Sequence, residues 1–299
     1  MSRSTQTVVR RGKVGSDATR LLPMWLSWLV RIVVTILVIA PVAGLLWLSA
    51  MPSQRIMDGD LGPSHLTWTN YRDAFVEVHL ASALAHTLIS ASITAVVCVL
   101  CSSTFAYVTS RFWKRSSHIV MNLLIGAQTL PAAVLLLPLF IMFVSLQSVV
   151  HAPLIGTYPA LIVTFVAFGL PLSVWLTWSY MESVPEVLEE AALVDGASRV
   201  HTFFYIVAPL MRSGMVVIGV LVFIGVWNDL QFASVLSNDS TATVSVSLQR
   251  FLATESGALL PQYGPLMAAS VIVSLPVVIL YLVFQRQLSR GLSLGAVKG

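Results

Sequence analysis

The chain has 299 residues, of which 57% are apolar and 10% are charged, and its formal net charge at pH 7 is +4. Soluble domains carry about 25% charged residues, so this composition excludes a soluble protein and indicates a chain that lies in membrane lipid. The positive charge requires no nucleic-acid partner, because basic residues gathered on the inner side of a membrane account for it.

The charged residues are bunched, and long uncharged stretches separate them. About 20 apolar residues cross the hydrocarbon core as a helix, and a backbone in lipid must satisfy its own hydrogen bonds. We therefore expect an all-α membrane protein with six transmembrane helices. Their predicted ranges are 31–51, 81–109, 118–146, 158–181, 211–233 and 265–285. The transmembrane domain then covers 31–285, with its core at 81–285 and with tails at 1–30 and 286–299.

The longest uncharged stretch, 116–181, is predicted to hold two crossings. The segment 151–158 divides them, because its proline and glycine residues are typical of turns. Four prolines also fall inside three of the predicted crossings, the third, fourth and sixth, and each removes an intrahelical hydrogen bond, so kinks are expected there. They are Pro131, Pro138, Pro171 and Pro276.

The basic residues predict the orientation of the chain, because Lys and Arg favour the cytoplasmic side. If both termini are cytoplasmic, only Arg55, Arg72 and Arg250 of the 17 basic residues fall in outer segments. The polar lead before the first apolar run is long, and no small-residue cleavage site follows that run. We therefore expect an uncleaved first helix rather than a signal peptide.

The segments between the crossings are short. The outer segment 52–80 is predicted to form a turn near Gly59 and a short amphipathic helix at Asn70–Phe75. The last outer loop, 236–264, is rich in Ser and Thr and is expected to be a solvated linker, with contact to a partner as the alternative.

Cys98 and Cys101 form a C-x-x-C pattern within the second predicted helix. A helix places two residues at this spacing on one face, which is apolar here. We therefore expect them to pack rather than to bind a metal or perform redox chemistry.

The cytoplasmic loop predicted at 182–211 carries several helix signals. Ser183 followed by Glu186 predicts a capping box, and Pro185 suits a first helical turn. Gly196 is typical of the residue that follows the carboxyl end of a helix. This pattern predicts a short helix that ends at Gly196.

A second short helix is expected to follow, with Ser198 as its N-cap, and Pro209 is expected to interrupt the chain before the fifth crossing. The first helix offers small and apolar side chains at helical spacing, which permit close approach of another helix or groove. They are Val187, Leu188, Ala191, Ala192 and Val194. The residues alone leave two alternatives open, a helix that seats in another protein and a helix packed on its own bundle.

The spacing of this loop resembles a known signature. Glu190-Ala-Ala, three residues, Gly196, nine residues and Ile206-Val-Ala-Pro209 are similar to the EAA motif in the inner-membrane permease subunits of binding-protein-dependent ABC importers. The usual Leu before the proline is Ala208 here, a departure that affects packing more than identity.

The resemblance extends over most of the chain and points to the carbohydrate branch, in particular to the maltose-permease G-type subunit. The short motifs that carry it are Asn70-Tyr71, Ala106-Tyr107, Arg111, Leu130-Pro131, Pro138-Leu-Phe140, Trp227-Asn-Asp229, Gln285-Arg286 and the tail Gly291–Gly299. The resemblance implies a type I ABC importer fold that imports a sugar or sugar-like solute by alternating access across the cell inner membrane.

The resemblance also implies the partners. They are a second, F-type permease, two copies of a cytoplasmic ATPase and an extracytoplasmic solute-binding lipoprotein, with membrane lipid around the chain. No G-x-x-x-x-G-K-[ST] loop occurs in the sequence, so ATP and Mg belong to the ATPase, and this chain is expected to bind no cofactor or metal and to be no enzyme.

The family roles transfer to particular residues. The implied ATPase-coupling residues are Glu189, Glu190, Ala191, Ala192, Asp195, Gly196, Ala197 and Pro209. Glu190 is expected to be the polar anchor, the two alanines the close-contact surface and Asp195 a cap or a partner for an Arg of the ATPase. Lys298 in the carboxyl tail is implied as a further ATPase contact.

A solute pathway is expected near Trp227, Asn228 and Asp229, in the outer third of the fifth crossing, because an ionisable group inside a membrane is by default a functional hypothesis. A structural pairing with a neighbouring helix is the alternative.

Other functions fit less well. A secondary transporter needs coupling carboxylates near mid-membrane, and Asp229 is the one acidic candidate. An intramembrane enzyme needs a catalytic or metal cluster, and the six histidines are scattered. An ABC permease for a non-sugar solute such as glycerol phosphate shares the EAA loop and stays open as an alternative.

Overall fold

The computed structural model describes residues 24–63, 65–255 and 262–296. All regular elements among these residues are helices. Six are long and apolar enough to cross a membrane, which confirms the predicted all-α class with six crossings. They are Met24–Ser49, Leu80–Phe112, Ala132–Val150, Tyr158–Met181, Arg199–Trp227 and Tyr263–Ser289.

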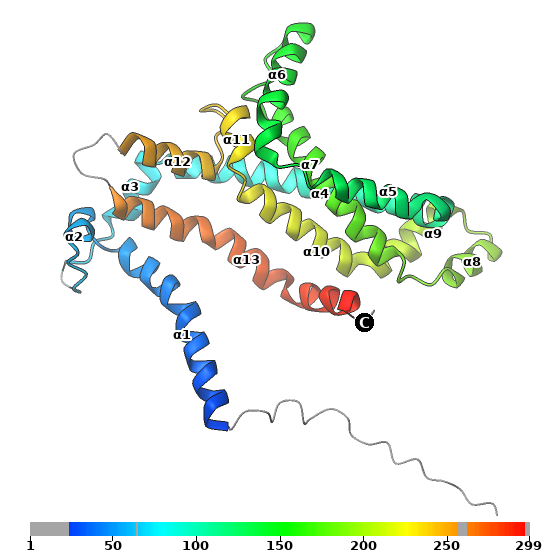
Figure 1. Cartoon of the computed structure of the whole chain (residues 1–299), viewed down its shortest axis with the longest axis horizontal. Coiled ribbons are helices and arrows are strands. Elements are labelled where there is room, and N and C mark those ends of the chain that lie inside the picture. The colour runs from blue at the N-terminus through cyan, green and yellow to red at the C-terminus, as the bar shows by residue number, and fades with distance from the viewer. Residues whose placement is uncertain (1–23, 64, 256–261, 297–299) are drawn as a thin grey trace, which may run out of the picture.

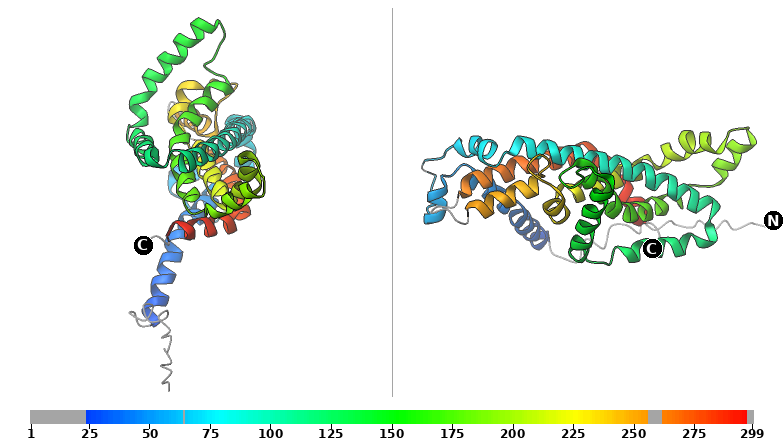
Figure 2. Two further views of the ribbon diagram at one scale, coloured as in Figure 1. Left: turned by 90° about the vertical axis from the view of Figure 1, so that its right-hand side faces the viewer. Right: turned by 90° about the horizontal axis from the view of Figure 1, so that it is seen from above.

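Four long helices run side by side and form the bundle. They are α4 (Leu80–Phe112), α7 (Tyr158–Met181), α10 (Ala208–Trp227) and α13 (Tyr263–Ala296). Small helices lie at its two ends (Figure 1): α2 (Ser53–Asp58) and α3 (Thr69–Glu77) at one, which we call the α3 end, and α8 (Val187–Val194) and α9 (Arg199–Thr202) at the other, the α8 end. In Figure 2, α1 (Met24–Ser49) and α6 (Ala132–Val150) extend away from opposite sides of the bundle.

Small side chains allow the bundle helices to approach closely. The buried face of α4, which packs on α7 and α10, consists mostly of Ala, Ser and Thr. Cys98 of this face is buried near Gly169 of α7, whereas Cys101 is exposed, and both thiols are free. The prediction that the two cysteines pack is therefore right for Cys98 only.

The third predicted crossing is not one helix. It divides into α5 (Lys114–Ala127) and α6, separated by residues 128–131. Pro131 lies in an extended conformation just before α6, because proline has no N–H to continue the helix and excludes the helical conformation from the residue before it. A kink was expected, and a complete break is found.

The fifth crossing also departs from the prediction. The helical run begins at Arg199, passes through a π-helical turn at Phe203–Val207 and continues through Pro209 to Trp227. In a straight α-helix the ring of Pro209 would crowd the carbonyl one turn earlier. The π turn adds one residue to the helix at that place, which gives the ring room. Pro209 therefore does not interrupt the chain.

Beyond Trp227 the chain forms α11 (Gln231–Leu236) and α12 (Val244–Glu255), so the expected solvated linker is wrong. Val244 and Val246 are fully buried, and the Val244 N–H donates to Thr87 Oγ1 of α4 at 2.8 Å. Both α10 and α12 pack on α4, and α12 lies toward the α3 end (Figure 1).

Several bounds agree closely with the sequence, and the terminal helices do not. The fourth crossing matches its prediction at both ends, and α3 confirms the expected short helix at Asn70–Phe75. Gly59 ends α2 with a φ of 72°, which confirms the turn. The terminal helices are longer than predicted: α1 begins at Met24, inside the expected tail 1–30, and α13 continues into the expected tail 286–299.

Two glycines of α10 provide a matched test of helix packing. A Cβ at Gly214 would lie 2.7 Å from the ring of Tyr180 on α7, whereas a Cβ at Gly225 would have nothing within 4 Å. We expect Gly214→Ala to destabilise the chain by about 1–3 kcal/mol, as overpacking does. Gly225→Ala should be neutral or stabilising, because alanine favours helices. Thermal unfolding of the two purified variants in detergent measures the difference, and equal midpoints would contradict this packing.

Candidate functional site

The loop that joins α7 to α10 forms the α8 end of the bundle. Its predicted capping box is wrong. The Ser183 hydroxyl donates to the Tyr180 carbonyl oxygen at 2.6 Å, and the Glu186 carboxylate pairs with Lys114 instead of a backbone N–H. Ser183 lies in the turn after α7, where its N–H also donates to the Tyr180 carbonyl, and nearby cations attract Glu186. The helix α8 therefore begins at Val187 without a side-chain cap.

The turn between α8 and α9 follows the prediction. Gly196 has a φ of 86°, and its N–H donates to the Leu193 carbonyl at 3.1 Å while that of Ala197 donates to the Ala192 carbonyl at 2.9 Å. These two bonds form a Schellman motif, in which glycine is favoured because the left-handed conformation strains other residues. Ser198 Oγ accepts the His201 N–H at 3.2 Å, which confirms it as the N-cap of α9.

The helix α8 has two different faces. Glu189 and Ala192, one turn apart, are buried against the chain itself. Val187 and Val194 are 69% and 88% exposed, and Glu190, Ala191, Asp195 and Gly196 are exposed as well. The two alanines expected to form one contact surface therefore face different ways. Ala197 is half-buried, and Pro209 is exposed.

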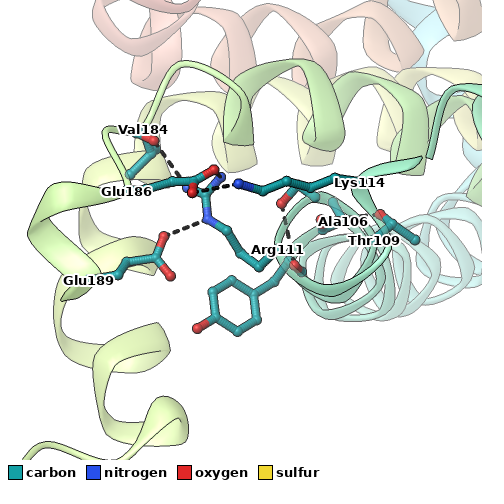
Figure 3. A network of polar contacts seen from close by, with 9 residues as sticks. Ala106, Thr109, Arg111, Lys114, Val184, Glu186 and Glu189 are labelled. Atoms are coloured by element: carbon teal, nitrogen blue, oxygen red, sulfur yellow. Dashed lines mark hydrogen bonds and ion pairs between the residues drawn. The ribbon is translucent and has the colours of Figure 1, made fainter. Parts of the chain in front are cut away.

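The buried face of α8 meets Arg111, in the last turn of α4 (Figure 3). Arg111 Nε lies 2.7 Å from Glu189 Oε1, and its Nη2 donates to the Val184 carbonyl at 3.0 Å. Both side chains of the Arg111–Glu189 pair are 7% exposed. Arg111 Nη1 lies 3.4 Å from Glu186 Oε1. One guanidinium therefore joins three residues of the loop.

A second cation completes this contact. Lys114 Nζ lies 2.6 Å from Glu186 Oε2 at an exposed position. The hydrogen bond from Lys114 lowers the pKa of the Glu186 carboxyl, and the charge of Arg111 acts in the same direction. Both carboxylates are thus acceptors for cations at the end of α4 and the start of α5.

Apolar packing fixes the base of the loop. A buried cluster contains Tyr107, Met181, Val184, Val207 and Met211. The Tyr107 ring lies 4.9 Å from that of Phe203, and the Arg199 guanidinium lies 4.9 Å from the centre of the Phe112 ring. One face of the loop is therefore packed against the bundle, and the opposite face is exposed.

The three expected pathway residues differ in position. Trp227 ends α10, and its buried ring stacks on Phe223. Asn228 is exposed and donates to the Ile224 carbonyl of its own helix at 2.9 Å. Asp229 Oδ1 accepts the Ala233 N–H at 3.0 Å and so caps α11. Asn228 and Asp229 lie after the end of α10, not within the outer third of a crossing, because the helix ends at Trp227.

Of these three residues, Asp229 lines a cavity of about 210 Å³ between α7, α10 and α11. Gln128, from the break between α5 and α6, lines the same cavity, and its Nε2 donates to the Phe168 carbonyl at 2.8 Å. The rings of Phe168 and Phe232 lie 4.3 Å apart in the wall. Two interrupted helices thus meet at one cavity. Gln128 was not predicted from the sequence, although a polar residue just before Leu130-Pro131 was the available signal.

Within the described residues, no three His, Cys, Asp or Glu side chains lie close enough together to hold a metal ion. Lys298, the residue expected in the carboxyl tail contact, lies outside the described residues.

Comparisons with known proteins match this architecture. The family described as "binding-protein-dependent transport system inner membrane component" matches residues 99–294. The trehalose transport system permease protein SugB of Mycobacterium tuberculosis is 31% identical over 87% of this chain and 92% of its own length. The trehalose/maltose transport system permease protein MalG of Thermococcus litoralis is 34% identical over 74% and 77%.

A solved structure shows the same fold. A chain of a bacterial ABC transporter involved in the import of the acidic polysaccharide alginate superimposes with a TM-score of 0.68 at 20% identity, covering 91% of this chain and 98% of that one.

The backbone at Gly196 generates a prediction about the loop. No atom within 4 Å would contact a Cβ there, so a substitution acts through the left-handed backbone alone. Gly196→Val should destabilise the turn by about 1–2 kcal/mol or more, whereas Gly196→Asn should cost less because Asn tolerates this conformation. Limited proteolysis within 182–211 measures the opening of the loop. Equal cleavage rates for the two variants would contradict the role of this turn.

Proposed function

Because the chain belongs to the family of binding-protein-dependent transport system inner membrane components, and is thus a multi-pass inner-membrane permease subunit of an ABC importer, we propose that its α8 loop docks on a cytoplasmic ATPase that drives import of a sugar. The observation that carries this proposal is the outward face of α8, where exposed apolar side chains lie beside the carboxylates of Glu190 and Asp195 at the exposed end of a loop that the bundle holds firmly.

Each residue of this face has its own role in docking on the ATPase. Glu190 is the polar anchor, Ala191 permits close backbone approach, and Asp195 pairs with a cation of the ATPase. Gly196 and the half-buried Ala197 form the turn that presents them, and Pro209 lies in the first turn of α10, which carries the motion into the bundle. Glu189 and Ala192 act from the buried side, where they hold α8 in place.

The proposal includes an orientation. The α8 end faces the cytoplasm, and both termini lie on that side. The basic residues support it: Arg111, Lys114, Arg115, Arg199 and Arg212 lie on the segments that form the α8 end, and Lys and Arg favour the cytoplasmic side of short loops.

The assembly contains more than this chain. ATP and Mg bind to two copies of the ATPase, and an extracytoplasmic binding lipoprotein delivers the solute. A companion F-type permease is supported by α1 and α6, whose most apolar segments are 0% and 6% buried in the isolated chain. The carboxyl tail with Lys298 is a further proposed ATPase contact.

The class of solute rests on the relatives. SugB and MalG are named for trehalose and for trehalose/maltose transport, which favours a sugar over glycerol phosphate. The cavity with Asp229 and Gln128 is the proposed pathway contact on this chain, because interrupted helices place polar groups at membrane depth only where they line a cavity or are buried in protein.

Replacing Val194 with Asp tests the docking face. The 88% exposed side chain contributes little to the fold, so the variant should insert normally but lose its apolar contact with the ATPase, and co-purification of the ATPase with the permease should fall about tenfold, as for loss of a central contact. Val76→Asp, at an exposed position on α3, is the matched control. Normal co-purification and ATP-driven uptake with Val194→Asp, or uptake by this chain without any ATPase, would refute the proposal.

Replacing Asp229 with Asn tests the pathway. The Asn oxygen can still accept the Ala233 N–H, so α11 keeps its cap, but the charge in the cavity is lost. We expect the apparent KM for uptake to rise about tenfold, as when a charge-assisted hydrogen bond is lost. Unchanged uptake kinetics in proteoliposomes would assign Asp229 to capping alone.

A further inference from the structure

Arg111 and Glu189 form a buried ion pair that the docking face itself does not require. The guanidinium belongs to α4, and its three acceptors belong to residues 184–189. Two charges withdrawn from water are stable only when their hydrogen bonds are satisfied, and removing one partner leaves an uncompensated buried charge. The pair therefore keeps one relative position of α4 and α8.

The neighbouring pair provides a contrast within the same two segments. Lys114 and Glu186 have side chains that are 59% and 42% exposed. Solvent screens such a pair, so it contributes little to holding the loop. Three ion pairs thus connect the end of α4 and the start of α5 to the loop, Arg111–Glu189, Arg111–Glu186 and Lys114–Glu186. Of these, only Arg111–Glu189 has both side chains buried, so it is the pair that fixes the loop.

The helix α4 reaches the opposite end of the bundle without interruption. It runs from Leu80 to Phe112 and packs on α7 and α10. Near the α3 end, Thr87 Oγ1 accepts the Val244 N–H at the start of α12. The run that contains α10 ends at Trp227, and the carbonyl oxygen of that last residue accepts the Ser245 hydroxyl of α12 at 3.3 Å. The continuous helix α4, joined to the docking loop by the buried Arg111 pair, therefore connects that loop to α12 alongside this contact from α10.

We propose that Arg111 is a positioning residue that couples the docking loop to α4, so that a displacement of α8 by the ATPase moves α4 as one body and reaches α12 at the α3 end. This inference rests on the proposed ATPase docking. Without Arg111, the outward face of α8 still binds the ATPase, but the loop shifts on α4 instead of moving it. ATP hydrolysis then proceeds without a matching uptake of solute.

The first experiment uses the full chain alone in detergent and measures amide hydrogen exchange. Arg111→Met and the nearly isosteric Glu189→Gln should accelerate exchange in residues 187–202, by about tenfold or more for Arg111→Met. Lys114→Met, the matched control at the exposed pair, should change it less than about threefold. Exchange that is unchanged in Arg111→Met and Glu189→Gln would overturn the proposal, whatever the ATPase does.

The second experiment uses the transporter reconstituted in proteoliposomes with its companion permease, ATPase and binding protein. Uptake per ATP hydrolysed should fall about tenfold in Arg111→Met, while hydrolysis per complex stays within about threefold. Glu189→Gln should shift the same ratio, and Lys114→Met should leave it unchanged.

The ratio separates positioning from folding. A pair needed only for folding lowers uptake and hydrolysis in equal proportion, and that result would overturn the proposal. If the unaltered transporter shows no ATP-driven uptake, the proposed function fails, and the exchange measurement still decides whether Arg111 holds the loop.

Discussion

The guanidinium of Arg111, buried where α4 meets the segment 184–189, sets the geometry of the α8 end. A buried cation must find its acceptors within the chain, so Glu189 turns inward. Successive helical residues point about 100° apart, so the inward direction of Glu189 determines which way the other side chains of α8 point. Ala192, one turn later, is buried with Glu189, whereas Glu190 and Ala191 face outward. Two adjacent glutamates thus have opposite surroundings because one cation lies beside only one of them.

Sequence reasoning was accurate where local chemistry decides the structure. Gly196 and Ser198 were predicted from backbone preferences and behave as predicted, because a cap is formed by residues only a few positions apart. Ser183 carries an equally good local signal, yet its hydroxyl bonds back to Tyr180 in the last turn of α7, and Lys114, distant in sequence, binds Glu186. The faces of α8 were likewise unpredictable from spacing, because they depend on Arg111, 78 residues away from Glu189 along the chain.

Hydropathy located the crossings but not their interruptions. An uncharged stretch indicates how many residues lie in lipid, but it does not show whether they form one straight helix or several segments with different axes. The break at 128–131 has a local cause in Pro131, whereas the one after Trp227 depends on Asp229, whose carboxylate replaces a missing backbone partner for α11. The sequence could identify Asp229 as an unusual charge, but its capping role and its shared cavity with Gln128 appear only when α5, α7, α10 and α11 are assembled.

At the α3 end, the side-chain amide of Asn70 donates to the carbonyls of Ser49 and Met51 at 2.9 and 2.8 Å, where α1 ends. Most of α1 before that point is exposed in the isolated chain. The first crossing is thus fixed at its carboxyl end, and the lipid or the companion subunit beside it sets the tilt of the rest. Over most of its length the sequence of α1 is therefore free to drift as long as it stays apolar, whereas position 70 is confined to a side chain that can donate two hydrogen bonds at once.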